Sequence, residues 1–199
     1  MLNIIKSGRA NAFRLLTQPA GYSLVEMMAT CAVMSVVGGM AVAQLTISQP
    51  VMKGDGAMRI VMGQLNSARE QSITKRRRMQ LDFVGNSTIQ ISRVEVPGPG
   101  ITVLSSIPLE GGVRFGIVAG VPDTPEAFGM NASVDFGAAG SMHFNTDGTL
   151  IDGGTGAPIN GTIFLVIPNF PRSFRAVTIM GSTGRIRGYR WNGANWEVA

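Results

Sequence analysis

The chain is poor in the residues from which most catalytic and metal sites are built. Its 199 residues include a single histidine, His143, and a single cysteine, Cys31. A metal cluster of His and Cys ligands is therefore excluded, and so is an intramolecular disulfide. A Ser-His-Asp set would depend on His143, which lies in no supporting motif. We expect no catalytic residue, no bound metal and no cofactor, and we do not expect an enzyme.

Charged residues are also scarce, at 15%, whereas glycine is abundant, with 26 residues. This composition favours a β-rich domain with many turns over a helical bundle. The glycine-rich residues 153–156 are not followed by a Lys-Ser or Lys-Thr pair. They therefore do not form the phosphate-binding loop of a nucleotide-binding protein.

An apolar segment near the N-terminus stands out in the sequence. No charged residue occurs between Met27 and Ala43, and residues 24–45 are numerous enough to cross a bilayer as one helix. Glu26 lies inside this segment, where a carboxylate costs about 2.5–3.5 kcal/mol on insertion scales. Before Glu26 there are three basic residues and no acid. The positive-inside rule therefore places the N-terminus in the cytoplasm and the rest of the chain across the membrane.

The six residues from Gly21 to Glu26 (Gly-Tyr-Ser-Leu-Val-Glu), with the apolar run after them, resemble the N-terminus of type IV prepilins and pseudopilins. The resemblance implies that a prepilin peptidase cuts between Gly21 and Tyr22 and methylates the new N-terminus. It also implies that Glu26 meets the N-terminal amine of a neighbouring subunit, and such pairing offsets the cost of burying both charges. Tyr22 departs from the phenylalanine that is usual in the family.

Two other interpretations of this segment stay open. An ordinary secretory signal peptide would use residues 41–43, Ala-Val-Ala, as its cleavage site. A plain signal anchor would carry Glu26 without any function for it. The position of Glu26 within the apolar segment, and the long leader before it, argue against the signal peptide.

The sequence divides into three regions. Residues 1–21 form the leader, residues 22–52 the membrane-spanning and assembly half of a long helix, and residues 53–199 a globular domain. The motif Lys-Gly-Asp-Gly at residues 53–56 is expected to mark a break, or the water-side end of the membrane helix. A second helical section is predicted at residues 57–78, where apolar residues recur at three- and four-residue steps. These residues are Met58, Val61, Met62, Leu65 and Ala68.

From Met79 onward the hydrophobic pattern changes to period two, which indicates strands. The predicted strands are residues 80–84, 88–94, 101–104, 112–118, 134–136, 141–144, 149–151, 162–167, 174–180 and 185–190, the last strand of the chain. Residues 121–130, with two prolines, are predicted to form a loop. The nearly continuous apolar strand at 162–167 is expected to be central. The predicted fold class is α+β.

Four segments in the C-terminal half resemble the GspH/FimT family of minor pilins and pseudopilins. They are residues 144–148 (Phe-Asn-Thr-Asp-Gly), the apolar strand 163–167, residues 176–179 and residues 184–187 (Gly-Arg-Ile-Arg). The resemblance implies a pilin-like fold, in which a long N-terminal helix packs on antiparallel β-sheets. It also implies a bacterial inner-membrane protein with one membrane pass and a periplasmic globular domain, which joins other pilins through its N-terminal helix.

Members of that family have two kinds of function, and the sequence leaves both open. Some are minor pilins of type IV pili that bind DNA during natural transformation, through a Gly-Arg-x-Arg motif that matches Gly184, Arg185 and Arg187 here. Others are structural tip or initiation subunits of the type II secretion pseudopilus and bind no DNA.

The residue pattern near the C-terminus is consistent with phosphate binding. After Asp152 there are five arginines and one acid, Glu197, so the local field is positive. In a strand Arg185 and Arg187 share one face, about 7 Å apart, which is close to the spacing of phosphates along a DNA strand. Arg190 completes the candidate DNA-binding set.

Alternatives remain for each of these side chains. The arginines are also explained as solvated strand residues or as partners of acids on a neighbour. Tyr189, Trp191 and Trp196 either stack on bases of a single strand or pack in the core. Without the leader the chain has 14 basic and 12 acidic residues, so its total charge gives no argument for nucleic acid.

Overall fold

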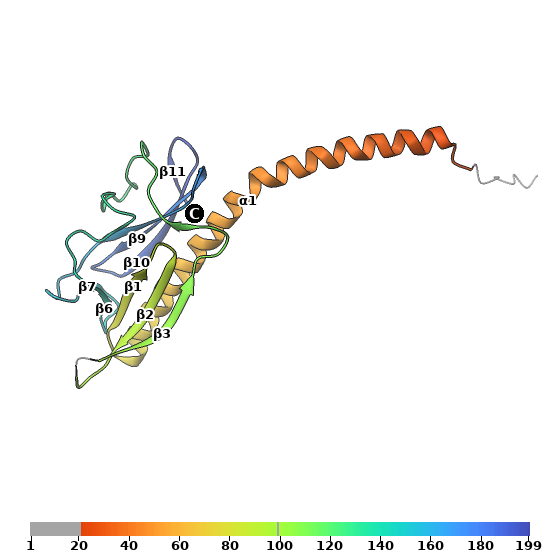
Figure 1. Cartoon of the computed structure of the whole chain (residues 1–199). Coiled ribbons are helices and arrows are strands. Elements are labelled where there is room, and N and C mark those ends of the chain that lie inside the picture. The colour runs from red at the N-terminus through yellow and green to blue at the C-terminus, as the bar shows by residue number, and fades with distance from the viewer. Residues whose placement is uncertain (1–20, 99) are drawn as a thin grey trace, which may run out of the picture. The chain divides into compact units, whose positions relative to one another are not determined.

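The computed structural model describes residues 21–98 and 100–199, and the predicted leader therefore lies outside the described residues except for Gly21. The described chain contains one long helix followed by two antiparallel sheets (Figure 1). The α+β prediction is confirmed. The chain divides into two compact units, one ending at Ala43 and the other comprising Gln44–Ala199.

Helix α1 (Leu24–Lys75) is a single helix of 52 residues that includes Pro50. The predicted break at residues 53–56 is therefore wrong. A Cβ atom built on Gly54 would lie 2.7 Å from the carbonyl oxygen of Ser173. Gly54 is thus explained by the close approach of the helix backbone to the strand that contains Ser173, and not by a turn.

The part of α1 that belongs to the first unit is exposed throughout and apolar except for Glu26, Thr30 and Ser35. Within the described residues, one helix contains a stretch long and apolar enough to cross a membrane, and this stretch lies near the N-terminus. An exposed apolar helix of this kind is unfavourable in water, because water would surround every apolar side chain. The length and composition of this stretch are compatible with a single membrane pass.

The first sheet has the strand order β3-β2-β1-β6-β7. Its strands are β1 (Met79–Val84), β2 (Thr88–Val94), β3 (Ile101–Pro108), β6 (Met142–Phe144) and β7 (Leu150–Asp152). The β1–β2 hairpin pairs Val84 with Thr88, as the turn residues between them predict.

The second sheet has the strand order β11-β10-β9-β8-β4, and β5 also pairs with β8. Its strands are β4 (Arg114–Phe115), β5 (Val134–Asp135), β8 (Gly161–Ile167), β9 (Phe170–Met180), β10 (Arg185–Trp191) and β11 (Trp196–Val198). The central position of β8 is confirmed. Two predictions need correction: the strand expected at 112–118 is reduced to the two residues of β4, and β10 is not the last strand.

The main core lies between the second half of α1 and the two sheets (Figure 1). The predicted apolar stripe of α1 is confirmed, because Met58, Val61, Leu65 and Ala68 are buried, while Met62 is half-buried. They pack in one cluster with side chains from both sheets. Removing apolar surface from water stabilises the folded chain by about 25 cal/mol per Å². Burial of this stripe therefore stabilises the packing of the helix on the sheets.

A second, smaller cluster covers the other face of the second sheet. It contains Phe164, Phe174, Ala176, Tyr189 and Trp191, with Val118, Val121, Met130 and Trp196 packed against it. Neighbouring residues of β9 alternate between the two clusters: Val177 and Ile179 belong to the first, Phe174 and Ala176 to the second. The second sheet therefore has one face toward α1 and the other toward the connection between β4 and β5.

Candidate functional site

Strand β10 carries the three arginines of the candidate DNA-binding set, but it does not bring them together. A Cβ atom built on Gly188 would lie 2.8 Å from the sulfur of Met62, so this position faces α1. Arg190 lies two residues further on and also reaches α1, where it contacts Asp55. Arg185 and Arg187 have the opposite parity and contact the β4–β5 connection. Arg190 is thus on the other face of the sheet.

Arg185 and Arg187 share one carboxylate. Nη2 of Arg185 lies 2.8 Å from Oε1 of Glu126, and Nη1 of Arg187 lies 3.5 Å from the same oxygen. Glu126 is only 10% exposed, whereas the two arginine side chains are 41% and 45% exposed. Within this chain the carboxylate that pairs with both arginines therefore comes from the predicted loop at 121–130. One carboxylate thus pairs with two guanidinium groups, and the same connection also carries Asp123, which accepts hydrogen bonds from the backbone N–H groups of Thr124 and Gly129.

Gly184, the first residue of the Gly-Arg-Ile-Arg motif, has a structural explanation of its own. Its φ is +63°, in the left-handed region that favours glycine, and a Cβ atom would collide with the carbonyl oxygen of Gly148. Arg69 of α1 lies at the same point, donating to the carbonyl oxygens of Gly148 and Thr183 at 3.2 and 3.0 Å. The glycine therefore fits the β9–β10 turn beside α1, whatever the arginines bind.

On the face toward α1, Asp55 holds two arginines. Its Oδ1 lies 2.6 Å from Nε of Arg175, which is fully buried, and its Oδ2 lies 3.1 Å from Nη2 of Arg190. Arg175 also donates to the carbonyl oxygens of Val51, Arg172 and Phe174. A buried guanidinium is costly unless it is paired and hydrogen-bonded, and here it is both. This ion pair joins the helix to β9.

The aromatic side chains near the C-terminus are packed and do not form a base-stacking surface. Tyr189 is 2% exposed and Trp191 8%. Trp196 packs against Phe174 with ring centroids 5.1 Å apart and the ring planes tilted by 48°, and its Nε1 donates to the carbonyl oxygen of Pro122 at 2.8 Å. Of the two sequence interpretations, core packing is the one that the structure supports.

The N-terminal candidate residues lie at the start of α1. Gly21 and Tyr22 precede the helix and are exposed, and Glu26 lies in its first turn. A carboxylate in the first turn interacts favourably with the unpaired N–H groups of the helix. No ion pair to Glu26 is present within residues 21–98 and 100–199, so any cation that neutralises it comes from elsewhere.

His143 lies in β6, half-buried, with its Nε2 3.2 Å from Oε1 of Gln80. Burial lowers the pKa of His143 below its ordinary value of 6.5, and the nearby Arg78 acts in the same direction. In the part of the chain that the structure describes, no group of three or more His, Cys, Asp and Glu residues is placed to hold a metal ion.

No family profile, curated protein or solved structure matches this chain.

Proposed function

We propose that this protein is a filament subunit of the type IV pilin class, anchored in the bacterial inner membrane by the first part of α1. The observation that carries the proposal is the composition of that helix along its length. Its first part is apolar and exposed with a single carboxylate, Glu26, and its later part is buried against two sheets. A helix of this kind joins a membrane, or a bundle of like helices, to a folded domain.

Processing by a prepilin peptidase after Gly21 would create a new amine at Tyr22, two residues before α1 begins. In a bundle of such helices, the amine of one subunit and Glu26 of the next are both removed from water. Each charge alone is costly there, whereas the pair is much less so. The mature globular domain would lie in the periplasm, and the partners would be other pilins or pseudopilins.

The test of this proposal separates processing from assembly. In cells that make the filament, Glu26→Ala should leave cleavage after Gly21 intact and abolish incorporation into filaments. Glu26→Asp, which keeps the charge, is the matched control and should retain part of the incorporation. Normal incorporation of Glu26→Ala would contradict the pairing of Glu26 with a neighbour's amine.

A second candidate function is the binding of DNA through Arg185 and Arg187. The observation that favours it is that both side chains are more than 40% exposed while they share a single, nearly buried carboxylate. Phosphate oxygens suit the arginine fork well. Binding would address the backbone and not the base sequence. The alternative is a structural tip or initiation subunit of a type II secretion pseudopilus that binds no DNA.

The structure supplies a control for this test, because Arg190 lies on the opposite face of the sheet. DNA binding by the full chain in detergent would be measured across a salt series. Neutralising two phosphates predicts a slope of about −1.8 in log K against log salt. Arg185→Gln with Arg187→Gln should abolish binding, and Arg190→Gln should leave it unchanged. Glu126→Gln should strengthen binding, because it removes the carboxylate that competes with phosphate.

The result that favours the structural subunit is equally clear. If neither the native chain nor Glu126→Gln binds DNA at low salt, or if binding does not depend on Arg185 and Arg187, the DNA proposal fails. The assembly proposal would be unaffected, because it depends on Glu26 and α1.

A further inference from the structure

Strand β3 forms one edge of the first sheet and contains no charged residue. Its eight residues, Ile-Thr-Val-Leu-Ser-Ser-Ile-Pro, run from Ile101 to Pro108. It pairs with β2 on one side and stands at the end of the strand order (Figure 1). At such an edge the N–H and C=O groups on the second side of the strand are unpaired, and they form a template for another strand.

The first four residues of β3 are all exposed. Ile101 is 54% exposed and Val103 52%, and Thr102 and Leu104 are exposed as well. In a strand that rests on a core, buried and exposed residues alternate, because successive side chains point to opposite faces. The loss of alternation means that the described part of the chain covers neither face of the strand here.

The hydrogen bonds of β3 leave its outer side open. In residues 21–98 and 100–199, its side chains donate from Thr102 to Glu95 at 2.7 Å and from Ser105 to Gln64 at 3.1 Å. No strand other than β2 pairs with its backbone in these residues. The outer backbone groups of β3 are therefore free to pair with a strand from elsewhere.

The other edge strands of the two sheets are short and charged. Strands β4, β5, β7 and β11 have two or three residues each. Each carries one charged residue, which is Arg114, Asp135, Asp152 and Glu197, respectively. Short length and charge are two devices by which proteins prevent a foreign strand from pairing with an edge. Among the described strands, β3 alone is a long edge without charge.

Two features of β3 limit how much of it can pair. Its register with β2 shifts between Ile91 and Ser92, so that Leu104 has no partner in β2. Pro108 lacks an N–H group. The pairing segment is therefore residues 101–107, with an interruption at Leu104, and it suits a partner strand of about six residues.

We propose that residues 101–107 bind an extended segment of a partner protein, which becomes an additional strand of the first sheet. The unpaired backbone identifies the partner as a polypeptide, because a row of alternating N–H and C=O groups is matched by another strand. Ile101 and Val103 lie two residues apart and so share one face. The partner segment should therefore carry an apolar residue at every second position.

The charges beside β3 indicate that this partner segment is uncharged. Arg93, which is opposite Thr102 in the register, pairs with Glu95 at 2.6 Å. Because each neutralises the other, neither is left for a charge on the partner. The proposal does not depend on the membrane anchor, because β3 belongs to the second compact unit.

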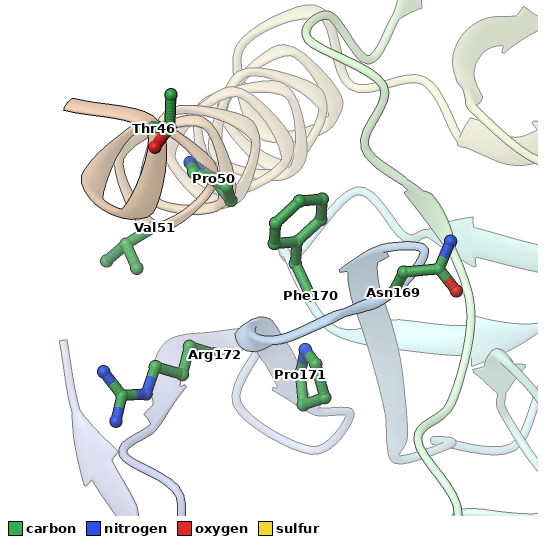
Figure 2. Close-up of a pocket in the computed structure, with 7 residues that line it drawn as sticks. All are labelled: Thr46, Pro50, Val51, Asn169, Phe170, Pro171 and Arg172. Atoms are coloured by element: carbon green, nitrogen blue, oxygen red, sulfur yellow. The ribbon is translucent and has the colours of Figure 1, made fainter. Parts of the chain in front are cut away.

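The apolar pocket beside α1 differs from this edge. It has a volume of about 560 Å³ and is lined by Thr46, Pro50 and Val51 of the helix and by residues 169–172 of the β8–β9 hairpin. Figure 2 shows the ring of Phe170 near Pro50. The hairpin pairs its own backbone, Ile167 with Phe170, so the pocket offers side chains and no open strand. It therefore does not select a polypeptide as β3 does.

The experiment titrates the full chain in detergent with a blocked peptide of about seven alternating threonine and valine residues. One lysine and one glutamate at its ends keep the peptide soluble without net charge. Nuclear magnetic resonance signals and hydrogen exchange of the amides of residues 101–107 measure binding at β3. The matched control peptide has the same side chains and a methyl group on every backbone nitrogen, so it cannot donate hydrogen bonds.

We expect the unmethylated peptide to shift these signals and, at millimolar concentration, to slow their hydrogen exchange at least about threefold. The affinity of the methylated peptide should be at least about tenfold weaker. Val103→Lys places a charge on the edge and should weaken binding to a similar extent. Val198→Lys is the matched control on β11, where Val198 is also exposed, and it should bind the peptide as the native chain does.

Each contrary result overturns the proposal in a recognisable way. Equal binding of the two peptides would mean that β3 is an apolar patch and not a strand edge. Signals of residues 101–107 that do not shift in millimolar peptide, or shifts confined to another strand, would exclude β3 as the binding site. A native chain that dimerises in detergent, and becomes monomeric with Val103→Lys, would identify a second copy as the occupant in place of a partner protein.

Discussion

Replacing Asp55 by alanine should destabilise the globular unit strongly, because it removes the carboxylate that pairs with Arg175. The guanidinium of Arg175 is fully buried, and Asp55 lies 2.6 Å from its Nε. Arg190 shares the same carboxylate from a position that is 43% exposed. The change therefore leaves one buried and one partly exposed cation without their counterion.

The size of the effect follows from burial. Removing one partner of a buried ion pair costs about 3–5 kcal/mol. Asp55 is itself 21% exposed, and Arg175 keeps three backbone carbonyl acceptors. We therefore expect Asp55→Ala to lower the free energy of unfolding by about 2–4 kcal/mol. For a unit of this size that corresponds to a fall in Tm of about 5–12 °C.

Thermal unfolding of the full chain in detergent, followed by near-ultraviolet circular dichroism, measures this effect. Arg190→Gln is the matched control and should cost only about 0.2–1 kcal/mol, because its pair with Asp55 is partly solvated. Asp55→Asn keeps an acceptor oxygen and should fall between the two. If Asp55→Ala costs no more than Arg190→Gln, the Asp55–Arg175 pair does not hold α1 on β9, and the reasoning is refuted.

Two further predictions concern the same unit. Gly54→Ala forces a methyl group against the carbonyl oxygen of Ser173 and should lower the free energy of unfolding by about 1–3 kcal/mol. Gly56→Ala is the control: its methyl group meets open space, and it should raise the free energy of unfolding by up to about 1 kcal/mol. Thermal unfolding of both variants measures these changes. Because burial lowers the pKa of His143 below 6.5, the unfolded chain binds its proton first as the pH falls through that value. Denaturant unfolding should therefore show stability falling below about pH 6.5, and His143→Gln should flatten this slope.

Several features of the fold and the site were readable from local sequence. The change from period 3.6 to period two near Met79 predicted where the helix gives way to strands, because side-chain periodicity follows backbone geometry. The parity of β10 also separates Arg190 from Arg185 and Arg187, so the sequence contained the signal that divides the candidate set. The turn residues Asn192 and Gly193 likewise pointed to the missed strand β11.

Other features depend on partners far away in the sequence. Lys-Gly-Asp-Gly at 53–56 has the composition of a turn, yet it lies within a helix, because Gly54 and Asp55 face β9. Glu126 is in a loop with no periodicity and pairs with Arg185, 59 residues later. No local pattern predicts which acid a surface arginine will meet.

The sequence by itself determined the apolar segment with its single carboxylate, the order of helix and strands, and the absence of the His and Cys ligands needed for a metal cluster. These follow from residue types and spacing, which act over a few residues. Only the tertiary structure decided which carboxylate holds each arginine, which glycines are packed against backbone, and that Tyr189 and Trp191 are buried while Trp196 packs against them. Those outcomes depend on contacts such as that between Asp55 and Arg175, which are 120 residues apart, and packing of the whole domain brings such residues together.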